Sequence, residues 1–251
     1  MGANILALLL SAAAFQTPQP DTASPYSSPA VQQLVERAMA FLDLSHTIEH
    51  GMRTYPGLPG PLICDYLSRA ASRARYAPGV EFQIGKIEMV ANTGTYLDSP
   101  FHRYADGKDL AALPLESLAG LDAVLVRGGA AVGPEAFSGR DVAGKAVLVR
   151  TGWDVHWGTP AYLEGNPFLT GEAAEYLVAR GAALVGIDSL NVDDIRDLTR
   201  PVHSVLLGAG IPIVEHLCQL GPLPEAGFRF TAVPAKVAGF GTWPVRAFAT
   251  L

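Results

Sequence analysis

Short apolar runs rich in β-branched residues constrain the fold of this chain most strongly. They lie at residues 123–126, 146–149 and 183–187, and a fourth at 211–214 is strand-like. An apolar run of this length is typical of a strand buried within a sheet. Residues 171–180 have the spacing of an amphipathic helix and stop at Gly181, a residue that commonly ends helices. This alternation of strands and helices predicts a mixed α/β domain.

Weaker signals fill the rest of the chain. Residues 28–40 predict a helix, because apolar residues recur at helical spacing after a Ser-Pro start. Short strands are predicted at 41–48 and 82–90, whereas 202–207 is apolar and ambiguous. We find no internal repeat. We therefore expect residues 30–251 to form one domain.

Composition excludes several classes of protein. The chain has 251 residues, of which 49% are hydrophobic and 17% charged, so it can build a large core and is not disordered throughout. Its net charge of −6 and lack of a basic patch argue against nucleic acid or an anionic membrane as the main partner. Cys64 and Cys218 are too few for a disulfide scaffold or a cysteine-rich zinc module. We expect two free thiols, with one disulfide between them as the alternative.

The N-terminus has a composition of its own. Residues 3–15 form an apolar run whose length fits a secretory signal and is too short to span a membrane. No Lys or Arg precedes this run, which departs from the usual pattern, and residues 16–29 are rich in Pro, Ser and Thr. We interpret residues 1–29 as a signal peptide with a flexible lead-in. The chain is exported if residues 1–20 are such a signal, and cytoplasmic otherwise.

The segment 92–102, NTGTYLDSPFH, is the most informative one for chemistry. It follows a predicted strand, and Asp98 lies four residues before His102 in a loop containing Gly and Pro. An Asp and a His this close suit a metal site or a general base. The alternative is a turn in which Asp98 accepts hydrogen bonds from backbone N–H groups and His102 lies on the surface.

A second candidate lies at His203 and Glu215, which bracket an apolar, Gly-containing connection. A carboxylate at the end of a buried strand must be paired, coordinated or protonated, because an isolated buried charge is very costly. Metal coordination is one solution, and pairing of Glu215 with an arginine or the backbone is the other. His216 follows Glu215, so strand alternation would point it the other way.

These residues carry a resemblance to the cyclase-like metal-dependent hydrolases, which include bacterial kynurenine formamidase and isatin hydrolase. The family signature H-x-G-T-H-x-D-x-P-x-H aligns with residues 92–102. Five signature positions match and two histidines are replaced; the matches are Gly94, Thr95, Asp98, Pro100 and His102, and the replacements are Asn92 and Tyr96. The resemblance extends over about residues 41–250 through LDLSHTIEHGMRTYPG, RTGWDVHWG, VGIDSLNVDD and WPVRAFA.

The resemblance implies a role for each matching residue. Asp98, His203 and Glu215 would hold a divalent metal, and His102 would be the catalytic acid or base. The amide of Asn92 and the phenol of Tyr96 are poorer zinc or manganese ligands than imidazole. We therefore expect one metal per chain, Zn or Mn. The resemblance also implies a swivelling β/β/α fold with a mixed sheet, and a homodimer or higher homo-oligomer.

The implied activity is hydrolysis of a small aryl amide, in the manner of an arylformamidase that converts N-formylkynurenine to kynurenine and formate in tryptophan catabolism. We expect an aromatic wall for such a substrate at Phe101, Trp153, His156 and Trp157. One alternative is a single-metal hydrolase of lactams, lactones or esters. Another is a non-catalytic relative that only binds a ligand, as the changes at Asn92 and Tyr96 would allow.

Overall fold

A computed structural model of the chain describes residues 40–251. The N-terminal segment 1–29 lies outside this range, as does the helix predicted over 28–40 apart from its last residue. No helix within the described range is long and apolar enough to cross a membrane.

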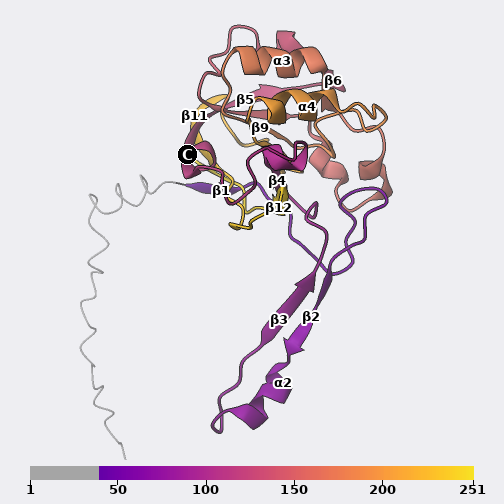
Figure 1. The fold of residues 1–251 in the computed structure, drawn as a ribbon, viewed down its shortest axis with the longest axis vertical. Helices are drawn as coiled ribbons and strands as arrows, with labels where there is room; N and C mark the ends of the chain where they lie inside the picture. Colours follow the sequence, from indigo (N-terminus) through magenta and orange to yellow (C-terminus); the bar gives the residue numbers. More distant parts are fainter. Residues whose placement is uncertain (1–39) are drawn as a thin grey trace, which may run out of the picture. The chain divides into compact units, whose positions relative to one another are not determined.

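A mixed sheet organises the described residues (Figure 1). Its nine strands are, in spatial order, β1 (Phe41–Asp43), β13 (Phe248–Thr250), β11 (Ala226–Thr231), β5 (Leu121–Arg127), β7 (Ala146–Arg150), β9 (Leu184–Ile187), β10 (Ile213–Glu215), β4 (Tyr96–Asp98) and β12 (Thr242–Pro244). The four from β5 to β10 are mutually parallel, and the strands on either side pair antiparallel. The fold is therefore a mixed α/β domain, as the sequence predicts.

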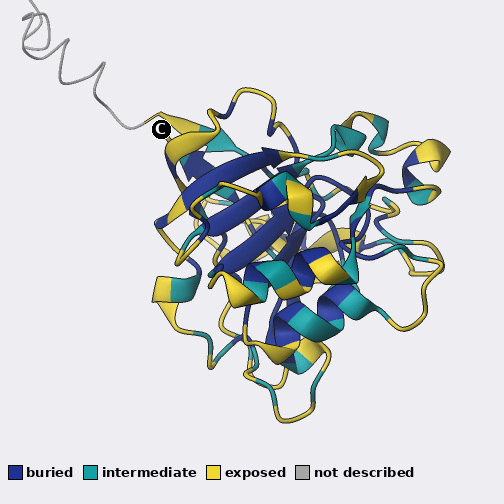
Figure 2. Ribbon diagram, turned by 90° about the horizontal axis from the view of Figure 1, so that it is seen from above, coloured by how far each residue is buried: buried dark blue, intermediate teal, exposed yellow. Residues whose placement is uncertain are grey.

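Helices cover one face of this sheet. The longer ones are α3 (Gly171–Ala179) and α4 (Pro201–Gly208), and short 3-10 turns occupy several connections. Their apolar residues pack against one set of alternating strand residues, which includes Val147 and Val149. The other set, which includes Ala146 and Leu148, faces the core on the opposite side of the sheet. Figure 2 shows the central strands buried and the helices exposed only on their outer faces. Because each fully buried Val or Leu contributes about 1.5–3 kcal/mol, these two layers dominate stability.

The central sequence predictions are confirmed. The runs at 123–126, 146–149 and 183–187 lie in β5, β7 and β9. The helix predicted over 171–180 is α3, in which Thr170 accepts a hydrogen bond from the Ala173 amide at the N-terminus. The ambiguous segment 202–207 is helical and lies in α4. The strand predicted over residues 41–48 is too long: only residues 41–43 pair with β13, so the prediction is wrong beyond Asp43.

Two smaller sheets complete the fold. One pairs β6 (Ala131–Val132) with β8 (Phe168–Leu169). The other is a hairpin of β2 (Leu62–Leu67) and β3 (Ile84–Glu88), with the short helix α2 (Arg69–Ser72) near its tip. Figure 1 shows this hairpin extending away from the main sheet. All of β3 is exposed, so the hairpin contributes little to the core.

Gly186 provides a test of the packing of the main sheet. A Cβ atom there would lie 2.8 Å from Leu217 Cδ1 and 2.9 Å from Leu148 Cδ2. Both leucines are fully buried, so neither side chain can move into open space. We expect Gly186→Ala to lower the free energy of unfolding by about 1–3 kcal/mol, as overpacking does. Urea denaturation measures this loss in the free energy of unfolding. Gly129→Ala is the control, because a Cβ there meets nothing within 4 Å; equal stability of the two variants would contradict this packing.

Candidate metal and catalytic site

Strand pairing brings the carboxylates of the candidate site together. Asp98 ends β4 and Glu215 ends β10, and these antiparallel strands place Ile213 opposite Asp98 and Tyr96 opposite Glu215. Side chains two residues apart on a strand share a face, so Tyr96, Asp98 and Glu215 lie on one face of the sheet. The site is thus built at the ends of two buried strands.

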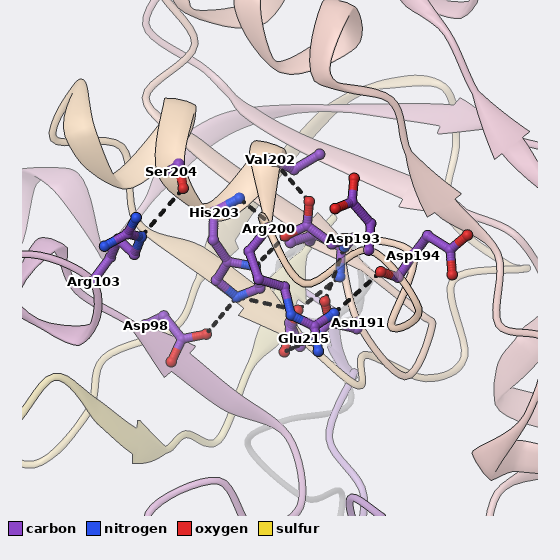
Figure 3. Close-up of polar contacts among 12 residues, drawn as sticks. Asp98, Arg103, Asn191, Asp193, Asp194, Arg200, Val202, His203, Ser204 and Glu215 are labelled. Atoms are coloured by element: carbon purple, nitrogen blue, oxygen red, sulfur yellow. Dashed lines mark hydrogen bonds and ion pairs between the residues drawn. The ribbon is translucent and has the colours of Figure 1, made fainter.

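Helix α4 brings His203 to the same place. Its Nε2 atom lies 3.7 Å from Asp98 Oδ2 and 3.7 Å from Glu215 Oε1 (Figure 3). His102 completes the group from the turn after β4, with its Nδ1 atom 3.8 Å from Asp98 Oδ1. One ligand atom from each of Asp98, His102 and His203 lies within 4.8 Å of the others, which is close enough to share a metal ion.

Asp193 fixes the orientation of His203. Its carboxylate accepts hydrogen bonds from the backbone amides of Val202 and His203, at 2.7 and 3.2 Å, and so caps the first turn of α4. The same carboxylate lies 2.6 Å from His203 Nδ1. Because Asp193 engages Nδ1, the Nε2 atom of His203 is directed toward Asp98 and Glu215. A carboxylate behind a histidine in this way is typical of metal sites.

The charges around His203 determine its protonation in the absence of metal. Burial alone would lower the pKa of His203. The contact with Asp193, together with the negative charges of Glu215 and Asp98, outweighs burial and raises the pKa to about 10. A divalent cation would meet the same negative charge, so a proton and a metal compete for His203 Nε2.

Asp98 provides the strongest test of whether a metal fits. The side chain is completely buried, and its Oδ2 atom has no hydrogen-bond partner among the residues that the structure describes. Its Oδ1 atom accepts a hydrogen bond from the Thr242 hydroxyl. Burial raises the pKa of Asp98, but His102 and His203 lower it to a net value below normal. A buried, ionised oxygen without a partner is costly unless a cation binds it, so the residues fit one metal ion.

Glu215 is engaged more fully than Asp98. Its Oε1 atom accepts a hydrogen bond from the Val192 amide at 2.7 Å. Its Oε2 atom accepts one from the Tyr96 hydroxyl at 2.7 Å and a longer one from Asn191 at 3.4 Å. Burial raises the pKa of Glu215 to about 7, although the charge of His203 acts in the opposite direction. Glu215, the predicted third ligand, therefore lies beside the cluster of Asp98, His102 and His203, and each of its carboxylate oxygens already accepts a hydrogen bond.

Tyr96 occupies one of the positions where the motif has histidine. Burial and the charge of Glu215 raise the pKa of the Tyr96 hydroxyl well above its usual value. The phenol therefore stays neutral, and its proton is directed to Glu215. Asn92, at the other replaced position, lines the adjacent cavity. Tyr96 thus donates a hydrogen bond to the Glu215 carboxylate. Positions 92 and 96, where the motif has histidine, therefore offer no imidazole ligands for a second metal.

A cavity of about 310 Å³ opens beside the cluster. Its lining combines apolar, amide, charged and candidate catalytic side chains, namely Tyr55, Pro56, Leu58, Asn92, Tyr96, His102, Arg103, Asn191, Arg200, His203 and Glu215. This volume is at the lower end for a small-molecule site and suits a substrate with one ring.

The aromatic wall expected from the sequence lies elsewhere. None of Phe101, Trp153, His156 and Trp157 lines this cavity. The Trp153 indole donates to the Tyr162 carbonyl at 3.0 Å and packs against His156, and Trp157 stacks on His46 at 3.8 Å. Tyr162 also pairs with His216, which is fully buried, at 2.8 Å. The aromatic residues between 153 and 162 pack against one another and against His46 and His216. The cavity owes its apolar wall to Tyr55, Pro56 and Leu58 instead.

Sequence reasoning missed two residues that organise the site. Asp193 lies in the segment VGIDSLNVDD, which the resemblance includes, but nothing in its spacing from His203 indicates a cap on α4. Thr242 precedes the closing WPVRAFA motif, and its pairing opposite Asp98 depends on β12 lying next to β4. A polar residue at the start of a three-residue strand is a weak signal, so only the fold identifies Thr242.

Known proteins resemble this chain over most of its length. Residues 42–194 match the family model Cyclase, described as "Putative cyclase". A kynurenine formamidase from Bacillus cytotoxicus is 28% identical over 213 residues, which cover 84% of this chain and 97% of that protein. A kynurenine formamidase from Bacillus cereus is 27% identical over 209 residues, covering 82% and 95%.

Solved structures share the fold. A structure described as a potential metal-dependent hydrolase with cyclase activity superposes with a TM-score of 0.68 at 25% identity, covering 85% of this chain and 98% of that chain. Isatin hydrolase A from Labrenzia aggregata superposes with a TM-score of 0.74 at 22% identity, covering 88% and 99%. The second likeness, at this low identity, concerns the fold alone.

Proposed function

Because the chain belongs to the Cyclase family of metal-dependent hydrolases, we propose that it hydrolyses the C–N bond of a small aryl formamide, as in the conversion of N-formylkynurenine to kynurenine and formate. The observation that carries this proposal is the buried Asp98 Oδ2 atom, which lacks a hydrogen-bond partner among residues 40–251 and lies 3.7 Å from His203 Nε2. The likeness to two kynurenine formamidases supports the substrate class.

We propose that Asp98, His203 and Glu215 hold one divalent ion, zinc or manganese. When bound, such an ion supplies Lewis-acid chemistry, because it lowers the pKa of water and polarises a carbonyl group. Asp193 keeps His203 turned toward the ion through its 2.6 Å contact with Nδ1. The hydrogen bonds that Glu215 accepts do not exclude binding, because each carboxylate oxygen has two acceptor sites.

We propose that His102 transfers the proton. The Thr242 hydroxyl donates its single proton to Asp98, so toward His102 it can only accept. It lies 2.8 Å from His102 Nδ1, which must then carry the hydrogen of a neutral ring. This leaves Nε2 as the free base. With a side chain 36% exposed at the cavity, His102 can take a proton from the attacking water and return it to the leaving amine.

Nucleophilic attack by water on the formyl carbon breaks the C–N bond and releases formate and an aryl amine. The Tyr96 proton is committed to Glu215, so Tyr96 is poorly placed to stabilise the oxyanion. The amides of Asn92 and Asn191 line the cavity and are the donors better suited to this role.

The test combines elemental analysis with a substrate panel. We expect about one zinc or manganese per purified chain, and turnover of N-formylkynurenine faster than of isatin or an aryl lactone. Turnover of only the lactam or lactone would favour the related single-metal hydrolase. A chain without metal after reconstitution, and without turnover of any of these compounds, would identify a ligand-binding relative and overturn the proposal.

We also propose that the chain forms a homodimer. Support comes from the β2–β3 hairpin, which exposes apolar side chains along both strands and near its tip, at Leu62, Ile63, Tyr66, Phe82, Ile84 and Ile87. Exposed apolar surface of this kind is typical of contacts with another protein. Sedimentation equilibrium should give the mass of two or more chains, and the mass of a single chain at micromolar concentration would contradict the proposal.

A further inference from the structure

Two arginine side chains, Arg103 and Arg200, line the cavity beside the catalytic cluster. Arg103 donates through Nε to the Ser204 hydroxyl at 3.2 Å and lies over the ring of Tyr104. Arg200 donates to the Asp194 backbone carbonyl at 3.2 Å and to the Tyr55 hydroxyl at 2.9 Å. These partners are all uncharged, so within the described part of the chain neither guanidinium is neutralised by an ion pair.

The nearby carboxylates are engaged by other groups. Asp194 pairs with Arg196 at 2.7 Å, and the Asp197 carboxylate accepts a hydrogen bond from the Thr199 hydroxyl at 2.7 Å. Figure 3 shows Arg200 beside Asn191 and Asp194, next to His203. The charge of Arg200 acts on Asp194 and Asp197 from a distance, but among the described residues no carboxylate pairs directly with its guanidinium, which can therefore bind an anion in the cavity.

The backbone at Arg200 is held in an unfavourable conformation. Its φ of 49° and ψ of 60° are left-handed, a conformation that non-glycine residues rarely adopt. Pro201 follows directly and begins α4. Strain of this kind persists only where the surrounding structure imposes it, and it is concentrated at functional sites. Here the contacts of the guanidinium with Tyr55 and Asp194 hold the side chain at the wall of the cavity.

We infer that Arg200 binds a carboxylate on the substrate, so that the enzyme selects anionic aryl amides over neutral ones. The inference rests on the proposed function and specifies the substrate class of the same site. A guanidinium has five N–H donors, and Arg200 uses two of them, which leaves three for a charged oxygen pair. Tyr55, Pro56 and Leu58 provide the apolar wall for the ring. A neutral lactam gains nothing from Arg200.

The test uses two substrates that differ in charge and by one methyl group, 2-formamidobenzoate and its methyl ester. We expect wild type to prefer the carboxylate in kcat/KM. Arg200→Gln should lower kcat/KM for the carboxylate by about 30-fold and change that for the ester less than about threefold. Arg200→Lys should recover part of the loss, because it restores the charge without the planar donor pair. Arg196→Gln is the matched control, since Arg196 lies on the same loop but is paired with Asp194.

Binding provides a readout that does not require turnover. Calorimetry of the metal-loaded wild type should show binding of 2-aminobenzoate, and Arg200→Gln should weaken this binding by a factor similar to the loss in kcat/KM. The methyl ester of 2-aminobenzoate should bind weakly to wild type and to Arg200→Gln. Equal losses for the acid and its ester, or unchanged binding of the acid in Arg200→Gln, would overturn the inference. Absence of turnover with intact, Arg200-dependent binding would instead refute the proposed hydrolase function and keep the role of Arg200.

Discussion

Asp98→Asn is expected to remove the metal and to reduce kcat/KM about a thousand-fold or more, because a divalent ion contributes several kcal/mol to transition-state stabilisation and each 1.36 kcal/mol is tenfold in rate. The substitution keeps the size of the side chain and removes its charge. In the wild type, the Oδ2 atom of Asp98 lacks a hydrogen-bond partner within residues 40–251 and lies 3.7 Å from His203 Nε2. An amide cannot offer a cation the same charged oxygen.

The measurement pairs elemental analysis with steady-state kinetics on the same preparation. Asp122→Asn is the control, because Asp122 is an exposed carboxylate on β5 that pairs with Arg229 at 3.6 Å. Circular dichroism establishes that both variants are folded. An Asp98→Asn enzyme that keeps its metal and turns over at the wild-type rate would show that Asp98 is not a ligand.

The sequence predicted the centre of the sheet well for a physical reason. Strands buried on both faces must be apolar throughout, so β5, β7 and β9 appear as continuous apolar runs. Helix α4 was ambiguous because it is short and mostly apolar, and a short apolar segment can be a buried strand or a buried helix. For the exposed strand β3, the sequence predicted residues 82–90 and the structure has Ile84–Glu88, because the ends of the strand depend on pairing with β2.

The site was predictable where its residues stand in recognisable motifs, and the contacts between those motifs were not. Asp98 and His102 stand in one motif, and the replacement of two histidines by Asn92 and Tyr96 already predicted a single metal site. The hydrogen bond between Tyr96 and Glu215 joins residues 119 positions apart and depends on the pairing of β4 with β10. For the same reason, the cavity wall from Tyr55 to Leu58 could not be inferred, and the aromatic residues of the WDVHWG segment were placed there instead.

His102→Gln should separate proton transfer from metal binding. We expect kcat to fall by about 100- to 10,000-fold, the usual contribution of a general acid or base, while the metal content stays near that of wild type. Glutamine can still accept or donate a hydrogen bond near Thr242, but it cannot carry a proton from water to the leaving amine. The partial exposure of His102, against the burial of Asp98 and His203, favours proton exchange over permanent coordination.

His156→Gln is the matched control for this substitution. The sequence suggested His156 as a pocket residue, but the structure places it against Trp153 and outside the cavity wall, so its kcat should change less than about threefold. Loss of metal together with activity in His102→Gln would make His102 a ligand, in the cluster that it forms with Asp98 and His203. In that case another group in the site would have to transfer the proton.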